Sequence, residues 1–117
     1  MSIQRHGTTR RYSDSVVHNG TVYLVEVPSR TDADISGQTE DLLASIDKLL
    51  AQAGSDKHHL LMVTVYLADM ADYDALNAVW DAWVPEGSAP VRACVQARLA
   101  NPGWRVEMAV TAALAQR

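Results

Sequence analysis

Three side chains that could take part in binding or catalysis lie in the segment from Pro90 to Met108. The guanidinium of Arg92 is followed two positions later by Cys94, the single cysteine of the chain, and fifteen positions later by the carboxylate of Glu107. A planar guanidinium binds a carboxylate through two parallel hydrogen bonds. A carboxylate between apolar neighbours can position a water or handle a proton. The segment therefore offers groups that could bind a small carboxylate and direct a water at it.

Each of these residues also has a structural interpretation. Arg92 could form an ion pair with an acidic residue at a subunit boundary. Glu107 could pair with Arg98 or Arg105 across neighbouring strands. Cys94 has no histidine near it in the sequence to activate it, so a small buried side chain is the better interpretation of the thiol.

The same segment predicts a β-hairpin. Two runs of alternating apolar and polar residues, 90–99 and 104–111, flank a turn at 100–103 that contains Pro and Gly, which is typical of a connection between strands. Side chains alternate between the faces of a strand. One face of this hairpin should therefore pack on a core, and the other should carry Arg92, Cys94 and Glu107.

Two strands and a helix are predicted before residue 55. Residues 16–17 and 21–25 are strand-like, and Asn19-Gly20 between them is a strong turn signal. Apolar residues from 42 to 53 recur at helical spacing. We expect this helix to begin after an N-cap at Ser36 and to end at Gly54, where a left-handed residue is favoured.

A third strand and a second helix follow. Residues 59–67 are rich in aliphatic and β-branched side chains and predict a strand that is buried on both faces. Asp69 or Asp72 should cap the second helix, and Pro85 should end it.

The predicted order is therefore β-β-α-β-α-β-β in an α+β fold with a mixed sheet. Two helices cover only one face of such a sheet. In a chain of this size the other face needs a partner, and we expect oligomerisation to bury it.

Composition restricts the function further. A chain of 117 residues with 48% hydrophobic content fits a single domain over residues 1–117. The net charge of −4 argues against nucleic acid as a partner. No apolar run is long enough to span a membrane, no signal peptide is visible and one cysteine forms no internal disulfide, so we expect a cytoplasmic protein. The adjacent His58 and His59 lack the spacing of metal ligands, so no metal site is predicted.

Several of these motifs together resemble the RidA family of enamine/imine deaminases, the YjgF-type proteins. The resemblance rests on the run from Pro90 to Val95, on Glu107 at its distance from Arg92, on Asn77 within residues 76–80, and on residues 64–70 and 37–39. It covers about residues 12 to 113.

The resemblance implies a homotrimer of chorismate-mutase-like subunits with sites in the clefts between them. It implies cofactor-free hydrolysis of 2-imino or 2-enamino acids to 2-keto acids and ammonia. Arg92 would hold the substrate carboxylate, backbone groups near Cys94 the nitrogen end, and Glu107 the water. Asn77 would shape the cleft, and Tyr12 would reach into a neighbouring site.

The chain departs from the family pattern at the end of its second predicted strand. Where RidA-like sequences have Ser-Gly-Gln, this chain has Val25-Glu26-Val27. Glycine allows close backbone approach to a ligand, whereas Glu26 adds bulk and negative charge. If Glu26 faces the cleft, the chain could instead be a non-catalytic or differently specific protein that binds a small carboxylate metabolite between subunits. A ribonuclease is the third alternative, and the acidic charge disfavours it.

Overall fold

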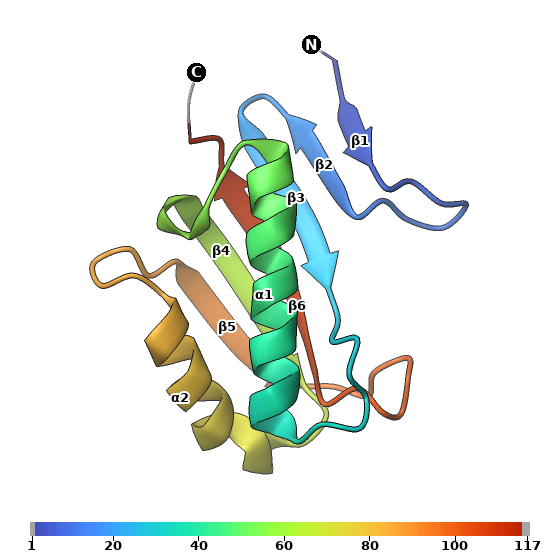
Figure 1. The fold of residues 1–117 in the computed structure, drawn as a ribbon, viewed down its shortest axis with the longest axis vertical. Helices are drawn as coiled ribbons and strands as arrows, with labels where there is room; N and C mark the ends of the chain where they lie inside the picture. The colour runs from blue at the N-terminus through green and yellow to red at the C-terminus, as the bar shows by residue number, and fades with distance from the viewer. Residues whose placement is uncertain (1, 116–117) are drawn as a thin grey trace.

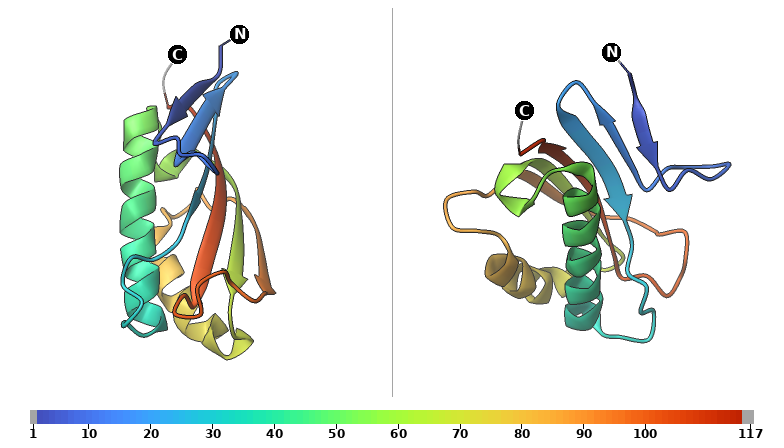
Figure 2. Two further views of the ribbon diagram at one scale, coloured as in Figure 1. Left: turned by 90° about the vertical axis from the view of Figure 1, so that its right-hand side faces the viewer. Right: turned by 45° about the horizontal axis from the view of Figure 1, so that its top comes forward.

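The computed structural model describes residues 2–115. Its α-helices are α1 (Ile35–Ala53) and α2 (Tyr73–Trp83), and short 3-10 turns, η1 (Lys57–His59) and η2 (Met70–Asp72), precede β4 and α2. Its strands are β1 (Gln4–His6), β2 (Ser15–His18), β3 (Thr21–Glu26), β4 (Leu60–Leu67), β5 (Val91–Gln96) and β6 (Val106–Ala113). The six strands form one mixed sheet in the order β1-β2-β3-β6-β4-β5, and both helices lie against the same face of it (Figure 1; Figure 2, left). The predicted α+β class and helix arrangement are confirmed, and β1 is an additional edge strand.

The long helix α1 forms where the apolar spacing predicts it. Leu42, Leu43, Ile46 and Leu50 are fully buried against the sheet. The helix begins two residues earlier than expected, because Asp34 rather than Ser36 is the N-cap and accepts the backbone N–H of Gly37 at 2.9 Å. Gly54 ends the helix in the left-handed conformation, at φ 89°, as predicted.

The predicted hairpin of residues 90–111 is wrong. β5 and β6 are not neighbours, since β4 lies between them and pairs parallel with β5 and antiparallel with β6. The alternating residues of β6 are buried along its whole length, which suits a central strand with β3 on one side and β4 on the other. A local turn signal does not distinguish a hairpin from a longer connection, and residues 97–105 here carry the chain past the end of β4.

The two faces of the sheet differ sharply. Val63, Val65 and Met108 belong to the core beneath the helices. The opposite face is open in a single chain, and large apolar side chains there remain between 44% and 70% exposed: Tyr23, Val25, Met62, Val91 and Val95. The prediction that residues 59–67 are buried on both faces is therefore wrong for one chain. No helix among residues 2–115 has the length and apolar character that a membrane crossing requires.

Candidate functional site

Arg92 lies on the face of β5 that the helices cover. It stands opposite the core residue Val63 in the parallel pairing with β4. Its guanidinium carbon is 5.3 Å from the ring centroid of Trp80 and 5.9 Å from that of Tyr73, both on α2. Nη2 donates a long hydrogen bond of 3.5 Å to the hydroxyl of Tyr73. The aromatic rings therefore hold the cation in place.

The Arg92 guanidinium has spare hydrogen-bonding capacity. Nη1 is buried and has no hydrogen-bond partner, and no carboxylate within residues 2–115 forms an ion pair with this side chain. An unpaired buried donor costs about 1–3 kcal/mol. The side chain is therefore suited to an added acceptor with two oxygens, such as a carboxylate.

Cys94 and Asn77 lie on β5 and α2, the two elements that hold this guanidinium and its aromatic partners. Cys94 is two residues along β5 on the same face, and burial raises the pKa of its thiol, although the Arg92 charge works against this. The thiol is therefore protonated at neutral pH and is a poor nucleophile. Asn77 is one helical turn after Tyr73 and near Trp80, so it shares their face of α2. We call this group the arginine half-site: Tyr73, Asn77, Trp80, Arg92 and Cys94.

Glu107 lies on the opposite, open face of the sheet. It pairs with Tyr66 of β4, while its neighbours Val106 and Met108 enter the core. Its side chain borders two adjoining hollows. One, of about 320 Å³, is also lined by Tyr66 and Arg98. The other, of about 500 Å³, extends around the end of β3.

The second hollow contains most of the remaining predicted residues. Tyr12 and Trp104 contribute aromatic side chains to it, and Glu26 and Glu107 contribute carboxylates. We call these four residues the carboxylate half-site. Tyr12 is 64% exposed at the rim, in a turn that the N–H of Thr9 closes by donating to the Tyr12 carbonyl.

Glu26 faces this hollow even though its strand parity is that of the core residue Leu24. It is the last residue of β3 and still pairs with Met108 of β6. Its Oε1 accepts the backbone N–H of Val27 at 3.1 Å. Burial raises the pKa of Glu26, the Val27 hydrogen bond opposes this, and the charges of Asp14 and Asp41 add to it.

Within one chain the two half-sites do not meet. The expectation that Arg92 and Glu107 share a polar face is wrong, because β4 pairs Val63 with Arg92 but Tyr66 with Glu107, and Val63 and Tyr66 point to opposite faces. The polar side of β5 turns toward α2, and its apolar side, with Val91 and Val95, is the open one.

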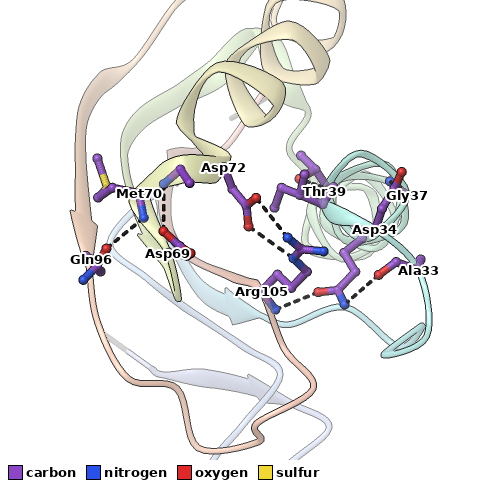
Figure 3. Close-up of polar contacts among 12 residues, drawn as sticks. Ala33, Asp34, Gly37, Thr39, Asp69, Met70, Asp72, Gln96 and Arg105 are labelled. Carbon is purple, nitrogen blue, oxygen red and sulfur yellow. Dashed lines mark hydrogen bonds and ion pairs between the residues drawn. The ribbon is translucent and has the colours of Figure 1, made fainter.

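A polar clamp that the sequence did not predict connects the elements of the two half-sites. Arg105, two residues before Glu107, donates through Nε and Nη2 to the carboxylate of Asp72 at 3.2 and 3.0 Å (Figure 3). Asp72 is almost fully buried and immediately precedes Tyr73. The fully buried Gln38 accepts the backbone N–H of Arg105 at 2.8 Å and donates to the Gly103 carbonyl at 3.0 Å. The alternative pairing of Glu107 with Arg105 is therefore wrong.

The start of α2 differs from the predicted cap at Asp69 or Asp72. Asp72 makes no capping hydrogen bond, and Asp69 instead caps the preceding turn through the N–H of Ala71. The side chain of Gln96, at the end of β5, accepts the N–H of Met70 (Figure 3). No local signal in the sequence could have paired Asp72 with a residue 33 positions away.

Comparison with known proteins identifies the family. The family model described as Endoribonuclease L-PSP matches residues 2–114. A RutC family protein of Haemophilus ducreyi is 47% identical over 113 residues, which is 96% of this chain and 97% of the relative. The RutC family protein YoaB of Escherichia coli K12 is 47% identical over 97% of this chain and its own full length. The chain belongs to the RidA family, the YjgF/RutC proteins.

Solved structures agree with this assignment of the RidA-family chain. A member of the YjgF protein family from Neisseria meningitidis is 50% identical, with a TM-score of 0.95, and the match covers 100% of this chain and 98% of that one. An uncharacterized protein from Pseudomonas aeruginosa is 45% identical, with a TM-score of 0.93 over 96% and 98% of the two chains. Both the resemblance and the fold it implies are confirmed.

Proposed function

We propose that this RidA-family chain hydrolyses reactive 2-imino and 2-enamino acids to 2-keto acids and ammonia without a cofactor. The observation that carries the proposal is the Arg92 guanidinium, stacked on two aromatic rings with a buried N–H that lacks an acceptor. A substrate carboxylate would supply that acceptor.

The proposal includes a homotrimer whose subunits complete one another's sites. The open sheet face exposes Tyr23, Val25, Met62, Val91 and Val95, and an apolar face of this kind favours contact with another copy. The arginine half-site of one subunit would then meet the carboxylate half-site of the next. This arrangement accounts for two half-sites that lie on opposite faces of one sheet.

The site needs mainly to position the substrate and a water, because imines already hydrolyse in water without an enzyme. Arg92 binds the carboxylate of the substrate, and backbone groups near Cys94 hold its nitrogen. Glu107 of the neighbouring subunit accepts a proton from a water whose oxygen bonds to the imine carbon, and it returns the proton to the nitrogen. The adduct then carries a hydroxyl and an amino group on the same carbon. Its hydroxyl proton moves to the nitrogen as the carbon–nitrogen bond breaks, so that ammonia leaves and the carbonyl of the 2-keto acid forms.

A coupled assay tests the proposal. A pyridoxal-phosphate dehydratase generates the imine, and the rate of 2-keto acid formation is compared with spontaneous hydrolysis. Arg92→Ala and Glu107→Gln should each lose at least tenfold of the added rate, while Arg5→Ala, at an exposed position of β1, should retain it. An Arg92→Ala variant that accelerates hydrolysis as well as the wild type would overturn the assignment.

A second candidate is a protein that binds a small carboxylate metabolite without hydrolysing imines. The observation that favours it is Glu26 in the hollow beside Glu107. Replacing Val25-Glu26 with Ser-Gly separates the two candidates, since a gain of imine hydrolysis from an inactive wild type would favour the binding protein. Ribonuclease activity is the weakest candidate, because the net charge is −4 and carboxylates line the hollow.

A further inference from the structure

The hollow next to Glu107 has an unusual charge. Its lining includes three carboxylates, those of Asp14, Glu26 and Glu107, and no Lys, Arg or His side chain. Its volume of about 500 Å³ lies in the range of small-molecule sites. Tyr12 and Trp104 give it aromatic walls, which suit apolar or cationic groups.

Glu26 has little to compensate for its burial in this hollow. It is half-buried, and within residues 2–115 its only hydrogen bond comes from the Val27 N–H and no cation pairs with it. A carboxylate in such a place is costly to fold, so its presence needs another reason.

We infer that Glu26 determines specificity by charge: the site accepts 2-imino acids with an uncharged or cationic side chain and rejects those with a second carboxylate. This inference rests on the proposed function. Arg92 anchors one carboxylate of the ligand in the arginine half-site, so that the acidic hollow receives the rest of the molecule.

The nitrogen end and the side chain of such a ligand both meet this negative field. A protonated imine nitrogen is attracted by it, and a neutral side chain is tolerated beside Tyr12 and Trp104. An anionic side chain is repelled, because no cation lines this hollow and Arg98 lines only the adjoining one.

The experiment measures kcat/KM for three imines made in situ by amino-acid oxidases from methionine, lysine and glutamate. For the wild type, the glutamate-derived imine should be at least tenfold poorer than the methionine-derived one. In Glu26→Gln, which keeps an oxygen for the Val27 N–H, the ratio of the two should move at least tenfold toward the anionic imine, and the preference for the lysine-derived imine should fall. Glu26→Gly should do the same.

Glu40→Gln is the matched control, because it removes one negative charge from an exposed position of α1 on the helical side, and its substrate order should equal that of the wild type. Equal changes for all three imines in Glu26→Gln, or a wild type that prefers the anionic imine, would overturn the inference.

A binding measurement separates this inference from the proposed function. In calorimetry, the corresponding 2-keto acids should bind the wild type in the same order, with the anionic one weakest. In Glu26→Gln this dependence of affinity on side-chain charge should be lost. If no imine is hydrolysed but that order appears, the proposed function is wrong and the charge selection stands. If imines are hydrolysed but neither hydrolysis nor binding depends on the charge of the side chain, the proposed function stands and the charge selection is wrong. If no imine is hydrolysed and no 2-keto acid binds, both are overturned.

Discussion

Arg92 and Cys94 occupy neighbouring positions on one face of β5 and differ in what their surroundings permit. The guanidinium stacks on Trp80 and Tyr73 and keeps a buried N–H without an acceptor, which favours anion binding. The thiol is partly buried, and burial raises its pKa, which disfavours a thiolate. At the residue scale, these surroundings favour the Arg92 side chain as an anion-binding group and disfavour the Cys94 thiol as a nucleophile.

The first prediction concerns Cys94. Cys94→Ala should keep kcat/KM for imine hydrolysis within about threefold of the wild type, since a protonated thiol supplies no nucleophile. Arg92→Lys should lose more than tenfold, because an ammonium lacks the planar pair of donors. Steady-state kinetics of both variants check this, and a hundredfold loss in Cys94→Ala would show that the thiol itself takes part.

The second prediction concerns Glu26 and pH. Burial raises the pKa of Glu26 in the folded chain, so the unfolded chain releases this proton at lower pH than the folded one. Below the ordinary pKa both states hold the proton and the effect vanishes. As pH rises through the folded pKa, the folded state loses stability relative to the unfolded state.

Glu26→Gln removes this loss while keeping the acceptor for Val27. Its urea midpoint should therefore exceed that of the wild type at neutral pH, and the difference should shrink as pH falls toward about 4. Unfolding curves at several pH values measure it, with Glu40→Gln as the comparison. A difference independent of pH would contradict the explanation by burial.

At the scale of elements, the clamp of Gln38, Asp72 and Arg105 fixes the start of α2 against the start of β6 (Figure 3). One end of the clamp immediately precedes Tyr73, which contacts Arg92, and the other lies two residues before Glu107. The clamp therefore sets the relation between elements that carry the two half-sites.

The third prediction tests the clamp. Asp72→Asn should lower the free energy of unfolding by about 1–2 kcal/mol, a modest loss because the Arg105 side chain is partly exposed and keeps its hydration. Asp81→Asn, at an exposed position of the same helix, should change it little. A double-mutant cycle with Arg105→Gln isolates the pair, and a coupling energy of zero would show that the pair does not hold the elements together.

At the scale of the whole molecule, one sheet face is packed and the other is open. The helices and the core occupy one side (Figure 2, left), and apolar side chains such as Tyr23, Met62 and Val95 remain exposed on the other. The arginine half-site belongs to the packed side, whereas Glu107 of the carboxylate half-site lies on the open side. A second copy is the simplest way to cover the open face and to bring the half-sites together.

The fourth prediction tests this assembly. Val95→Lys places a charge on the open face and should convert the proposed trimer to smaller species in light scattering, with loss of imine hydrolysis. Ala82→Lys, on the exposed side of α2, should give the same scattering mass as the wild type. A wild type that is monomeric at micromolar concentration would contradict the proposed assembly.

The fifth prediction tests whether the half-sites come from different chains. Arg92→Ala and Glu107→Gln are each expected to be inactive, but an equal mixture refolded together should recover about a quarter of wild-type activity, since one in four random subunit contacts pairs an intact arginine with an intact carboxylate. Sites built within a single chain would recover none.

Much of this organisation could be predicted locally. The periodicity of residues 42–53, the left-handed Gly54 and the Asn19-Gly20 turn specify their elements, because these signals depend only on near neighbours in the chain. The order and spacing of several motifs together, Arg92 and Glu107 among them, resembled the RidA family, to which the chain belongs.

The sequence alone therefore determined the helices, five of the six strands and the family. Only the tertiary structure decided that β6 enters between β3 and β4, which turned Arg92 and Glu107 to opposite faces, brought Glu26 to the hollow and paired Asp72 with Arg105. The physical reason is that the order of the strands, and the face on which each side chain lies, depend on contacts between segments distant in the chain. The alternation of residues within one strand does not indicate which edge of the sheet that strand joins.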